Sequence, residues 1–195
     1  MKNKDIFTFR DAEKQAGPVA FSTMLKPAGS ACNLDCHYCY YLDKAVQYGG
    51  KQAVMSDELL ELYVKQYIGA NDVDTVQFCW HGGEPLLLGV DFYRRAMAFQ
   101  QKYADGKRIE NTLQTNGTLV DEAWCDLFAG NNFLVGISLD GPQDIHDTFR
   151  LTKGGKPTFE RVMQTISMFQ RSGVEYNTLS VVNRLCEGRG GEIYR

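Results

Sequence analysis

Hydrophobic residues recur at helical spacing in several stretches of the chain. Residues 56–70, SDELLELYVKQYIGA, begin with a serine suited to capping a helix and contain a glycine near the end. Similar patterns predict helices over residues 91–106, 120–131 and 158–173, the last of which stops at a glycine. Residues 189–195, RGGEIYR, resemble the first turn of a further helix.

Short apolar runs with β-prone residues alternate with these helices. Several are followed by loops that contain glycine, namely PAG, HGGEP, TNG and LDG. Strands that alternate with helices of about 10–15 residues predict right-handed βαβ units around a parallel sheet, with the working loops at the carboxyl ends of the strands. The predicted strands cover residues 19–25, 75–80, 109–117, 133–141 and 174–183.

Five predicted strands define an α/β fold that is only part of a barrel, since a complete (β/α)₈ barrel takes about 250 residues. We expect residues 1–17 to form an N-terminal extension and residues 18–195 to form one incomplete core domain. The abrupt stop at a helical turn suggests part of a larger protein. The alternative is a naturally short, open sheet.

Composition excludes several classes of function. The chain has a formal net charge of −3 and no run of basic residues, which disfavours nucleic acid as a partner. No apolar stretch approaches the ~20 residues that cross a bilayer, and the charged N-terminus lacks the apolar middle of a signal peptide. We therefore expect a cytoplasmic protein, in which clustered cysteines indicate metal binding or catalysis rather than disulfides.

Three of the six cysteines lie within the eight residues CNLDCHYC, as Cys32, Cys36 and Cys39. Thiolates are soft ligands that favour iron–sulfur clusters, zinc or copper. Three cysteines leave one iron of a [4Fe–4S] cluster without a protein ligand, which is the property of a reactive site. Zinc would need a fourth ligand, and His37 is poorly placed for the same ion because it adjoins Cys36. Chance clustering of buried cysteines is the third and weakest interpretation.

The spacing Cys-x₃-Cys-x-aromatic-Cys, with Tyr38 as the aromatic residue, resembles the signature of the radical S-adenosylmethionine (radical SAM) enzymes. The resemblance implies a partial (β/α) radical SAM barrel with a parallel sheet and about five of its six strands. It implies two cofactors, a [4Fe–4S] cluster and S-adenosyl-L-methionine, whose amino and carboxylate groups chelate the open iron. It also implies reductive cleavage of S-adenosyl-L-methionine to a 5′-deoxyadenosyl radical that abstracts hydrogen from the substrate.

Further motifs fall where this resemblance needs them. The segment HGGEP matches the family's GGEP motif, in which Gly83 allows close backbone approach and Glu84 accepts hydrogen bonds from the cofactor's amino group. By the same resemblance, Ser138 and Arg150 hold the ribose and carboxylate end of the cofactor. Taken singly, a tight turn at Glu84 and a surface arginine at Arg150 would be the simpler interpretations. QTNG, residues 114–117, is either a polar turn or part of the same site.

The remaining cysteines and histidines have simpler interpretations. We expect Cys79, within a strand, and Cys125, within a helix, to be small core residues, and His146 to be a structural polar residue. Cys186 has no assignment from sequence. No catalytic residue is assigned from the sequence.

The motifs together are similar to those of the anaerobic sulfatase-maturating enzymes, from about Pro18 to Arg195. This resemblance implies oxidation of a cysteine or serine in a sulfatase to Cα-formylglycine, with a sulfatase polypeptide as substrate and flavodoxin or ferredoxin as electron donor. It also implies a C-terminal auxiliary-cluster domain that has no counterpart in these residues, so the activity of this chain alone is open. The alternatives are another peptide-modifying radical SAM enzyme, a zinc-binding structural module and an inert fragment.

Overall fold

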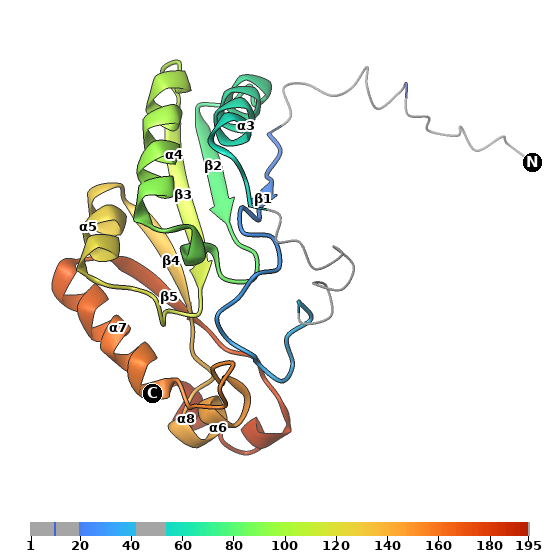
Figure 1. Cartoon of the computed structure of the whole chain (residues 1–195), viewed down its shortest axis with the longest axis vertical. Coiled ribbons are helices and arrows are strands. Elements are labelled where there is room, and N and C mark those ends of the chain that lie inside the picture. The colour runs from blue at the N-terminus through green and yellow to red at the C-terminus, as the bar shows by residue number, and fades with distance from the viewer. Residues whose placement is uncertain (1–9, 11–19, 42–53, 195) are drawn as a thin grey trace, which may run out of the picture.

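The computed structural model describes residue 10, residues 20–41 and residues 54–194 (Figure 1). In these residues, five parallel strands form one sheet whose spatial order is the order of the chain. The predicted domain boundary after residue 17 lies outside the described residues. The strands are β1 (Met24–Leu25), β2 (Thr75–Trp80), β3 (Arg108–Thr115), β4 (Phe133–Ser138) and β5 (Glu175–Leu179).

Helices connect the strands, and two of them begin at side chains that cap them. Ser56 Oγ accepts from the Leu59 amide at 3.2 Å, and Asp121 Oδ1 accepts from the Trp124 amide at 3.1 Å. The helices are α3 (Asp57–Ala70), α4 (Val90–Tyr103), α5 (Glu122–Gly130), α6 (Gln143–Phe149), α7 (Phe159–Ser172) and α8 (Gly190–Tyr194), with 3₁₀ turns η1 (Pro85–Leu88) and η2 (Arg184–Cys186). No helix among them is both long enough and apolar enough to cross a bilayer.

A parallel sheet in chain order places its connecting helices on one face, because the connections are right-handed. Figure 1 shows α4, α5 and α7 along the same side of the sheet. A sheet that never reverses its strand order has the topology of an opened barrel. The predicted fold, a partial (β/α) barrel with five parallel strands, is confirmed.

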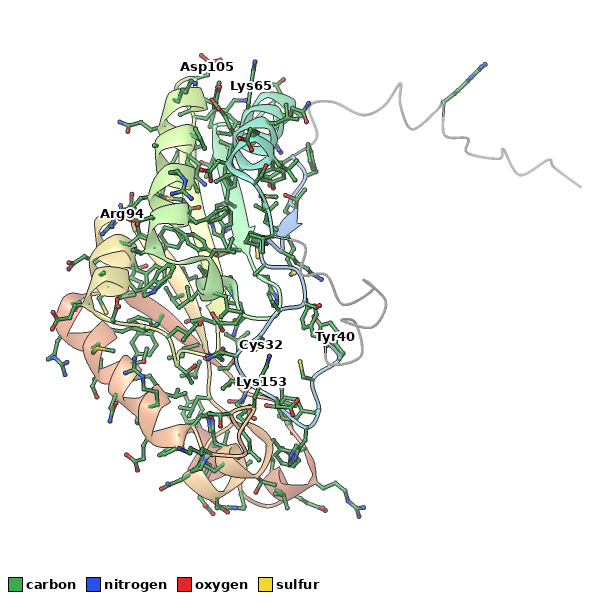
Figure 2. All side chains as sticks on the ribbon, in the orientation of Figure 1. Cys32, Tyr40, Lys65, Arg94, Asp105 and Lys153 are labelled. Atoms are coloured by element: carbon green, nitrogen blue, oxygen red, sulfur yellow. The ribbon has the colours of Figure 1, made fainter. Side chains whose placement is uncertain are left out.

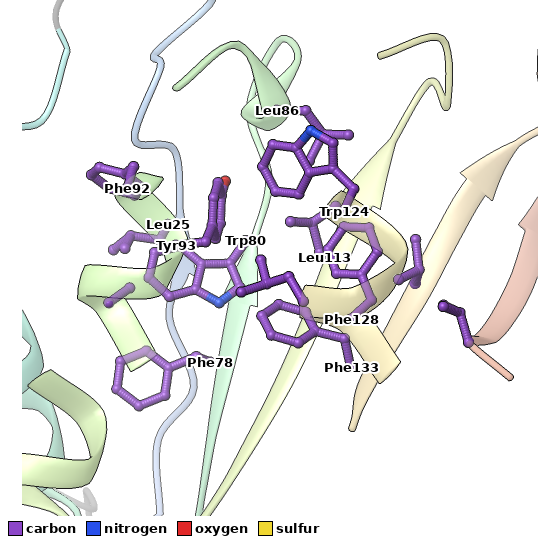
Figure 3. Close-up of a cluster of buried hydrophobic side chains, with 14 of the residues drawn as sticks. Leu25, Phe78, Trp80, Leu86, Phe92, Tyr93, Leu113, Trp124, Phe128 and Phe133 are labelled. Atoms are coloured by element: carbon purple, nitrogen blue, oxygen red, sulfur yellow. The ribbon is translucent and has the colours of Figure 1, made fainter. Parts of the chain in front are cut away.

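Alternating strand residues are buried under the helices. In β2, Val76, Phe78 and Trp80 are buried, while the alternating residues Thr75 and Gln77 are exposed. Figure 3 shows how Trp80 lies among aromatic side chains from β2, α4, α5 and β4. These rings meet mostly edge to face, which favours a single arrangement over a fluid one. They are Phe78, Phe92, Tyr93, Trp124, Phe128 and Phe133.

One polar residue in the core ties β2, β3 and α4 together. Asn111 Oδ1 accepts from Trp80 Nε1 at 2.8 Å and from Gln100 Nε2 at 2.9 Å. Asn111 Nδ2 donates in return to Gln100 Oε1 at 2.9 Å. The buried amides are therefore paired with each other, as burial without water requires.

The structure corrects several predicted boundaries. Residues 20–23 lie outside β1, so most of the predicted strand over 19–25 is wrong where it is described. The predicted strands over 109–117, 133–141 and 174–183 extend past the observed ends into polar or glycine-containing loops. The helix α6, at the end of the LDG loop, was not predicted, because seven residues are too few to show helical periodicity.

Candidate functional site at the carboxyl ends of the strands

The three clustered cysteines lie on a loop, residues 32–39, that we call the cysteine loop. Figure 2 shows Cys32 on this loop and Tyr40 just after it, on the side of the sheet away from Arg94 of α4. The loop pairs with the chain just after α6, since the Asp35 amide donates to Leu151 O at 2.8 Å. The His37 amide likewise donates to Phe149 O at 3.0 Å. The cysteine loop is therefore held by backbone hydrogen bonds.

All three thiols of the loop are free, with Cys36 buried and Cys32 and Cys39 partly buried. Burial raises the pKa of Cys32, and it raises the pKa of Cys36 to about 11. The other loop cysteines raise these pKa values further, because like charges would lie close together. The Arg150 guanidinium opposes this at Cys36. Ionising Cys32 and Cys36 therefore needs a positive charge close by.

This donor set fits an iron–sulfur cluster. Iron–sulfur clusters are held by cysteine thiolates. Each cysteine binds a different iron, so the three thiols need not converge on one point. Cys32 Sγ also accepts from the Leu34 amide at 3.4 Å and from Asn116 Nδ2 at 3.7 Å. Hydrogen bonds to sulfur are one means by which proteins tune such clusters. Within residues 20–41 and 54–194, no group of His, Cys, Asp or Glu side chains is arranged to hold a single metal ion.

The HGGEP segment lies directly against the chain that leads into the cysteine loop. The Gly83 amide donates to Gly29 O at 3.0 Å, and the Glu84 amide donates to Ala31 O at 2.7 Å. A Cβ atom on Gly83 would lie 2.1 Å from Ala31 O and 2.5 Å from Ser30 O. Gly83 is therefore required for the two backbone segments to approach each other.

Glu84 is fully buried and joins the ends of two elements. Its Oε1 accepts from Thr115 Oγ1 at 2.8 Å and from the Leu86 amide at 3.0 Å. Its Oε2 accepts from the Asn116 amide at 2.8 Å. Burial raises the pKa of Glu84 to about 7, against these three hydrogen bonds, which lower it. The carboxyl predicted to meet a ligand ammonium thus also organises the loop after β3.

Ser138 and Gln114 lie on the strand face away from the helices. Gln114 Nε2 donates to Ser138 Oγ at 3.1 Å, which leaves the hydroxyl hydrogen of Ser138 for another acceptor. Gly136 lies opposite Gln114 in the sheet, and a Cβ there would be 2.2 Å from Gln114 Oε1. The glycine therefore gives Gln114 the room to reach across β4.

Arg150 is buried and bound to an aspartate that the sequence analysis did not single out. Its Nε and Nη2 donate to Asp140 Oδ2 and Oδ1, both at 2.9 Å. Tyr38 O–H donates to the same carboxylate, and the Arg150 guanidinium carbon lies 5.4 Å from the Tyr38 ring centre. The interpretation of Arg150 as a surface residue is wrong. Its Nη1 has no hydrogen-bond partner among the described residues and is free to meet a ligand carboxylate.

A second unpredicted network links the cysteine loop to the loop after β3. Asn116 Nδ2 donates to Asn33 Oδ1 at 2.9 Å, and Asn33 Nδ2 donates to Thr118 Oγ1 at 2.8 Å. Thr118 Oγ1 donates to Asn116 Oδ1 at 2.7 Å, which closes the ring. QTNG is therefore more than an isolated polar turn. The sequence signal was its place after a strand, beside the other strand-end motifs.

The other singled-out residues divide between core and surface. Cys125 is buried in the core as predicted, and His146 is a buried structural residue as predicted. The core assignment of Cys79 is wrong, because Cys79 is only partly buried on the strand face away from the helices. Cys186 is buried in η2.

The family model of the Radical SAM superfamily matches residues 27–185. The chain therefore belongs to this superfamily, whose cofactors are a [4Fe–4S] cluster and S-adenosyl-L-methionine.

Particular relatives point further. The chain is 52% identical over 161 residues to a serine-type anaerobic sulfatase-maturating enzyme of Bacteroides thetaiotaomicron, covering 82% of this chain and 39% of the relative. It is 41% identical over 178 residues to a cysteine-type enzyme of Clostridium novyi, covering 90% and 47%. It also resembles the solved structure of native anSMEcpe with bound AdoMet and Cp18Cys peptide, with a TM-score of 0.82, 37% identity and coverage of 90% and 47%. The chain thus spans less than half the length of these relatives.

Proposed function

We propose that this chain is the radical SAM region of an anaerobic sulfatase-maturating enzyme, which oxidises a cysteine or serine of a sulfatase to Cα-formylglycine. The observation that carries this proposal is the arrangement of the cysteine loop. Cys32 accepts from Asn116 after β3, whose amide donates to Glu84 after β2, and Cys36 lies near Arg150, the residue after α6. The 52% identity to the serine-type relative supports this particular activity within the superfamily and favours serine as the oxidised residue.

We propose that Cys32, Cys36 and Cys39 bind three irons of the cluster. When bound, the cluster and S-adenosyl-L-methionine supply the 5′-deoxyadenosyl radical that removes hydrogen from the substrate. The chain's own part is to hold and orient these groups. The hydrogen bonds from Leu34 and Asn116 to Cys32 Sγ support that positioning.

The cofactor-binding residues in this proposal are Tyr38, Gly83, Glu84, Ser138 and Arg150. Gly83 lets HGGEP lie against the chain that leads into the cysteine loop, and Glu84 provides a carboxyl for the amino group. Ser138 has a hydroxyl hydrogen to donate, because its oxygen already accepts from a neighbouring amide. Arg150 has Nη1 available for a carboxylate, and the Tyr38 ring lies against its guanidinium.

The wider setting is also part of the proposal. We place residues 18–195 in an incomplete core domain after an extension over residues 1–17. The substrate is a sulfatase polypeptide, in line with the peptide in the solved relative. Flavodoxin or ferredoxin supplies the electron, and the protein works in the cytoplasm.

The first experiment is anaerobic reconstitution of the chain with iron and sulfide. We expect about four irons per chain, visible absorption of a cluster, and a change in its electron paramagnetic resonance (EPR) spectrum when S-adenosyl-L-methionine is added. Cys36→Ala should abolish cluster assembly, whereas Cys125→Ala, which removes a core thiol, should not. Zinc near one per chain without iron would instead support the zinc-binding module and overturn the proposal.

The second experiment uses the natural protein that contains this chain and two sulfatase-derived peptides that differ only by serine or cysteine at the target position. Mass spectrometry should detect loss of two hydrogens from serine, or replacement of the thiol by an aldehyde oxygen at cysteine. Unmodified peptides alongside an assembled cluster that responds to S-adenosyl-L-methionine would assign the protein to another peptide-modifying radical SAM reaction.

A further inference from the structure

A single buried carboxylate joins four segments beside the cysteine loop. Asp140 follows β4 and has no exposed side-chain surface. It accepts two hydrogen bonds from Arg150, one from Tyr38 O–H, and one from the Val181 amide at 2.9 Å. Its partners come from the cysteine loop, from the residue after α6 and from the chain after β5. Asp140 is therefore the point at which these segments are fixed relative to one another.

The pair that Asp140 forms with Arg150 is a true buried ion pair. The Arg150 side chain is 9% exposed, and its fork meets both carboxylate oxygens. Burial raises the pKa of Asp140, but the hydrogen bonds and charge of Arg150 outweigh it and leave that pKa below its usual value. Burial likewise lowers the pKa of Arg150, and Asp140 outweighs this. Both groups stay charged, so removing either leaves the other charge uncompensated.

This ion pair contacts the cysteine loop at a residue between two of its cysteines. Tyr38 lies between Cys36 and Cys39 in sequence, and its hydroxyl and ring contact Asp140 and Arg150 respectively. The two charges of the pair also lie near Cys36, Arg150 as a positive charge and Asp140 as a negative one. The ion pair can therefore affect the cysteine loop in two ways, through its contacts with Tyr38 and through its charges near Cys36.

A neutral histidine, His146, is hydrogen-bonded to the backbone of Asp140 and, through Thr158, to the backbone of Arg150. The Asp140 amide donates to His146 Nδ1 at 3.3 Å, and His146 Nε2 lies 3.1 Å from Thr158 Oγ1. Thr158 Oγ1 donates to Arg150 O at 2.7 Å. Nδ1 therefore accepts, which puts the proton on Nε2 and returns the chain of hydrogen bonds to Arg150. Both charged residues are therefore hydrogen-bonded through their backbones as well as through their side chains.

We infer that Asp140 is a positioning residue that, through Arg150 and Tyr38, fixes the cysteine loop and balances the charge beside Cys36. The inference rests on the proposed function in that it takes the cysteine loop as the site of a cluster. Asp140 does not touch the cofactors in this proposal. Its effect reaches the cluster through the geometry of Tyr38 and through the paired charges.

The electrostatic part is tested by the reduction potential of the reconstituted cluster. Asp140→Asn leaves Arg150 as a net positive charge near Cys36, so the potential should rise relative to wild type. Arg150→Gln leaves Asp140 as a net negative charge, so the potential should fall. Asp144→Asn is the matched control. Asp144 lies on α6, is exposed and is paired with Arg189, so its loss should leave the potential unchanged.

The mechanical part is tested by a milder pair of variants that keeps the ion pair. Tyr38→Phe removes only the hydroxyl that donates to Asp140, and it should speed the removal of iron from the cluster by a chelator several-fold. Tyr40→Phe is the matched control, since Tyr40 is 65% exposed and lies two residues along the chain. Its iron should be lost at the wild-type rate.

The outcomes separate this inference from the proposed function. If wild type assembles no cluster, the proposed function fails first. If wild type assembles the cluster, opposite shifts for Asp140→Asn and Arg150→Gln with faster iron loss in Tyr38→Phe support the inference. Equal iron loss in the two tyrosine variants overturns the mechanical part. Shifts in the same direction, or none in folded variants, overturn the electrostatic part.

Discussion

Gly83→Ala tests how closely HGGEP packs against residues 29–31, the chain that leads into the cysteine loop. The added methyl would lie 2.1 Å from Ala31 O and 2.5 Å from Ser30 O, both backbone atoms that cannot rotate away. The backbones would have to separate by roughly 1 Å before the closest contact reached 3.0 Å. Such a separation also stretches the hydrogen bonds that Gly83 and Glu84 donate across this contact.

The size of the effect follows from these contacts. Overpacking a tight site costs about 1–3 kcal/mol, and each of two stretched hydrogen bonds costs about 1 kcal/mol. We therefore expect Gly83→Ala to lower the free energy of unfolding by about 3–5 kcal/mol. This is a large part of the 5–15 kcal/mol typical of a domain. The reconstituted variant should also hold less iron than wild type, because the cysteine loop has moved.

Urea unfolding followed by circular dichroism measures the change. Gly69→Ala is the matched control, since Gly69 lies in α3 with open space around its Cβ position. That substitution should stabilise the protein by about 0.5–1 kcal/mol, because alanine favours the helix. If the free energy of unfolding of Gly83→Ala stays within about 0.5 kcal/mol of wild type, as it does for most surface substitutions, the close approach is not a real constraint.

Three further substitutions have expected results of their own. Burial raises the folded pKa of Glu84 from 4.5 to about 7, so the folded state keeps a proton that the unfolded state loses. The unfolding free energy should then fall by about 3 kcal/mol as pH rises from 4.5 to 7, and Glu84→Gln should flatten this dependence in a series of urea melts. Asn111→Leu leaves Trp80 Nε1 and the Gln100 amide unpaired in the core, and should cost about 2–4 kcal/mol by thermal or urea unfolding. Ser56→Ala removes the cap of α3 and should cost about 1 kcal/mol in the same assay.

Each of these three expectations would be contradicted by a specific result. A pH dependence that survives in Glu84→Gln would assign it to another group. An Asn111→Leu protein as stable as wild type would mean that the buried amides are not needed for the core. No loss in Ser56→Ala would mean that water replaces the serine at the start of α3.

The fold was largely predictable because its signals are local. Alternation in 75–80 shows which side chains of β2 face the helices, and the predicted strand has the observed bounds. Ser56 marks the start of α3 for the same reason, since a cap acts within one turn. The run over 19–25 was misleading because apolar character alone does not supply a strand partner. In β1, only Met24 and Leu25 pair with β2.

The site was predictable as a set of motifs but not as a set of contacts. The spacing of Cys32, Cys36 and Cys39 indicates the cluster chemistry directly, and strand ends indicate which loops share one edge of the sheet. The partner of Arg150 was not visible from that pattern, because α6 turns the chain back and brings Asp140 to it.

By itself, then, the sequence determined the order of the strands and of α3, α4, α5 and α7, the soft ligand set, and the glycine that lets HGGEP approach the chain before the cysteine loop. Only the tertiary structure decided that Glu84 is buried under the end of β3 and that Asp140 joins Tyr38 to Arg150. The physical reason is the range of the forces. Backbone propensity and ligand softness belong to single residues and their neighbours, whereas burial and ion pairing depend on where distant segments meet.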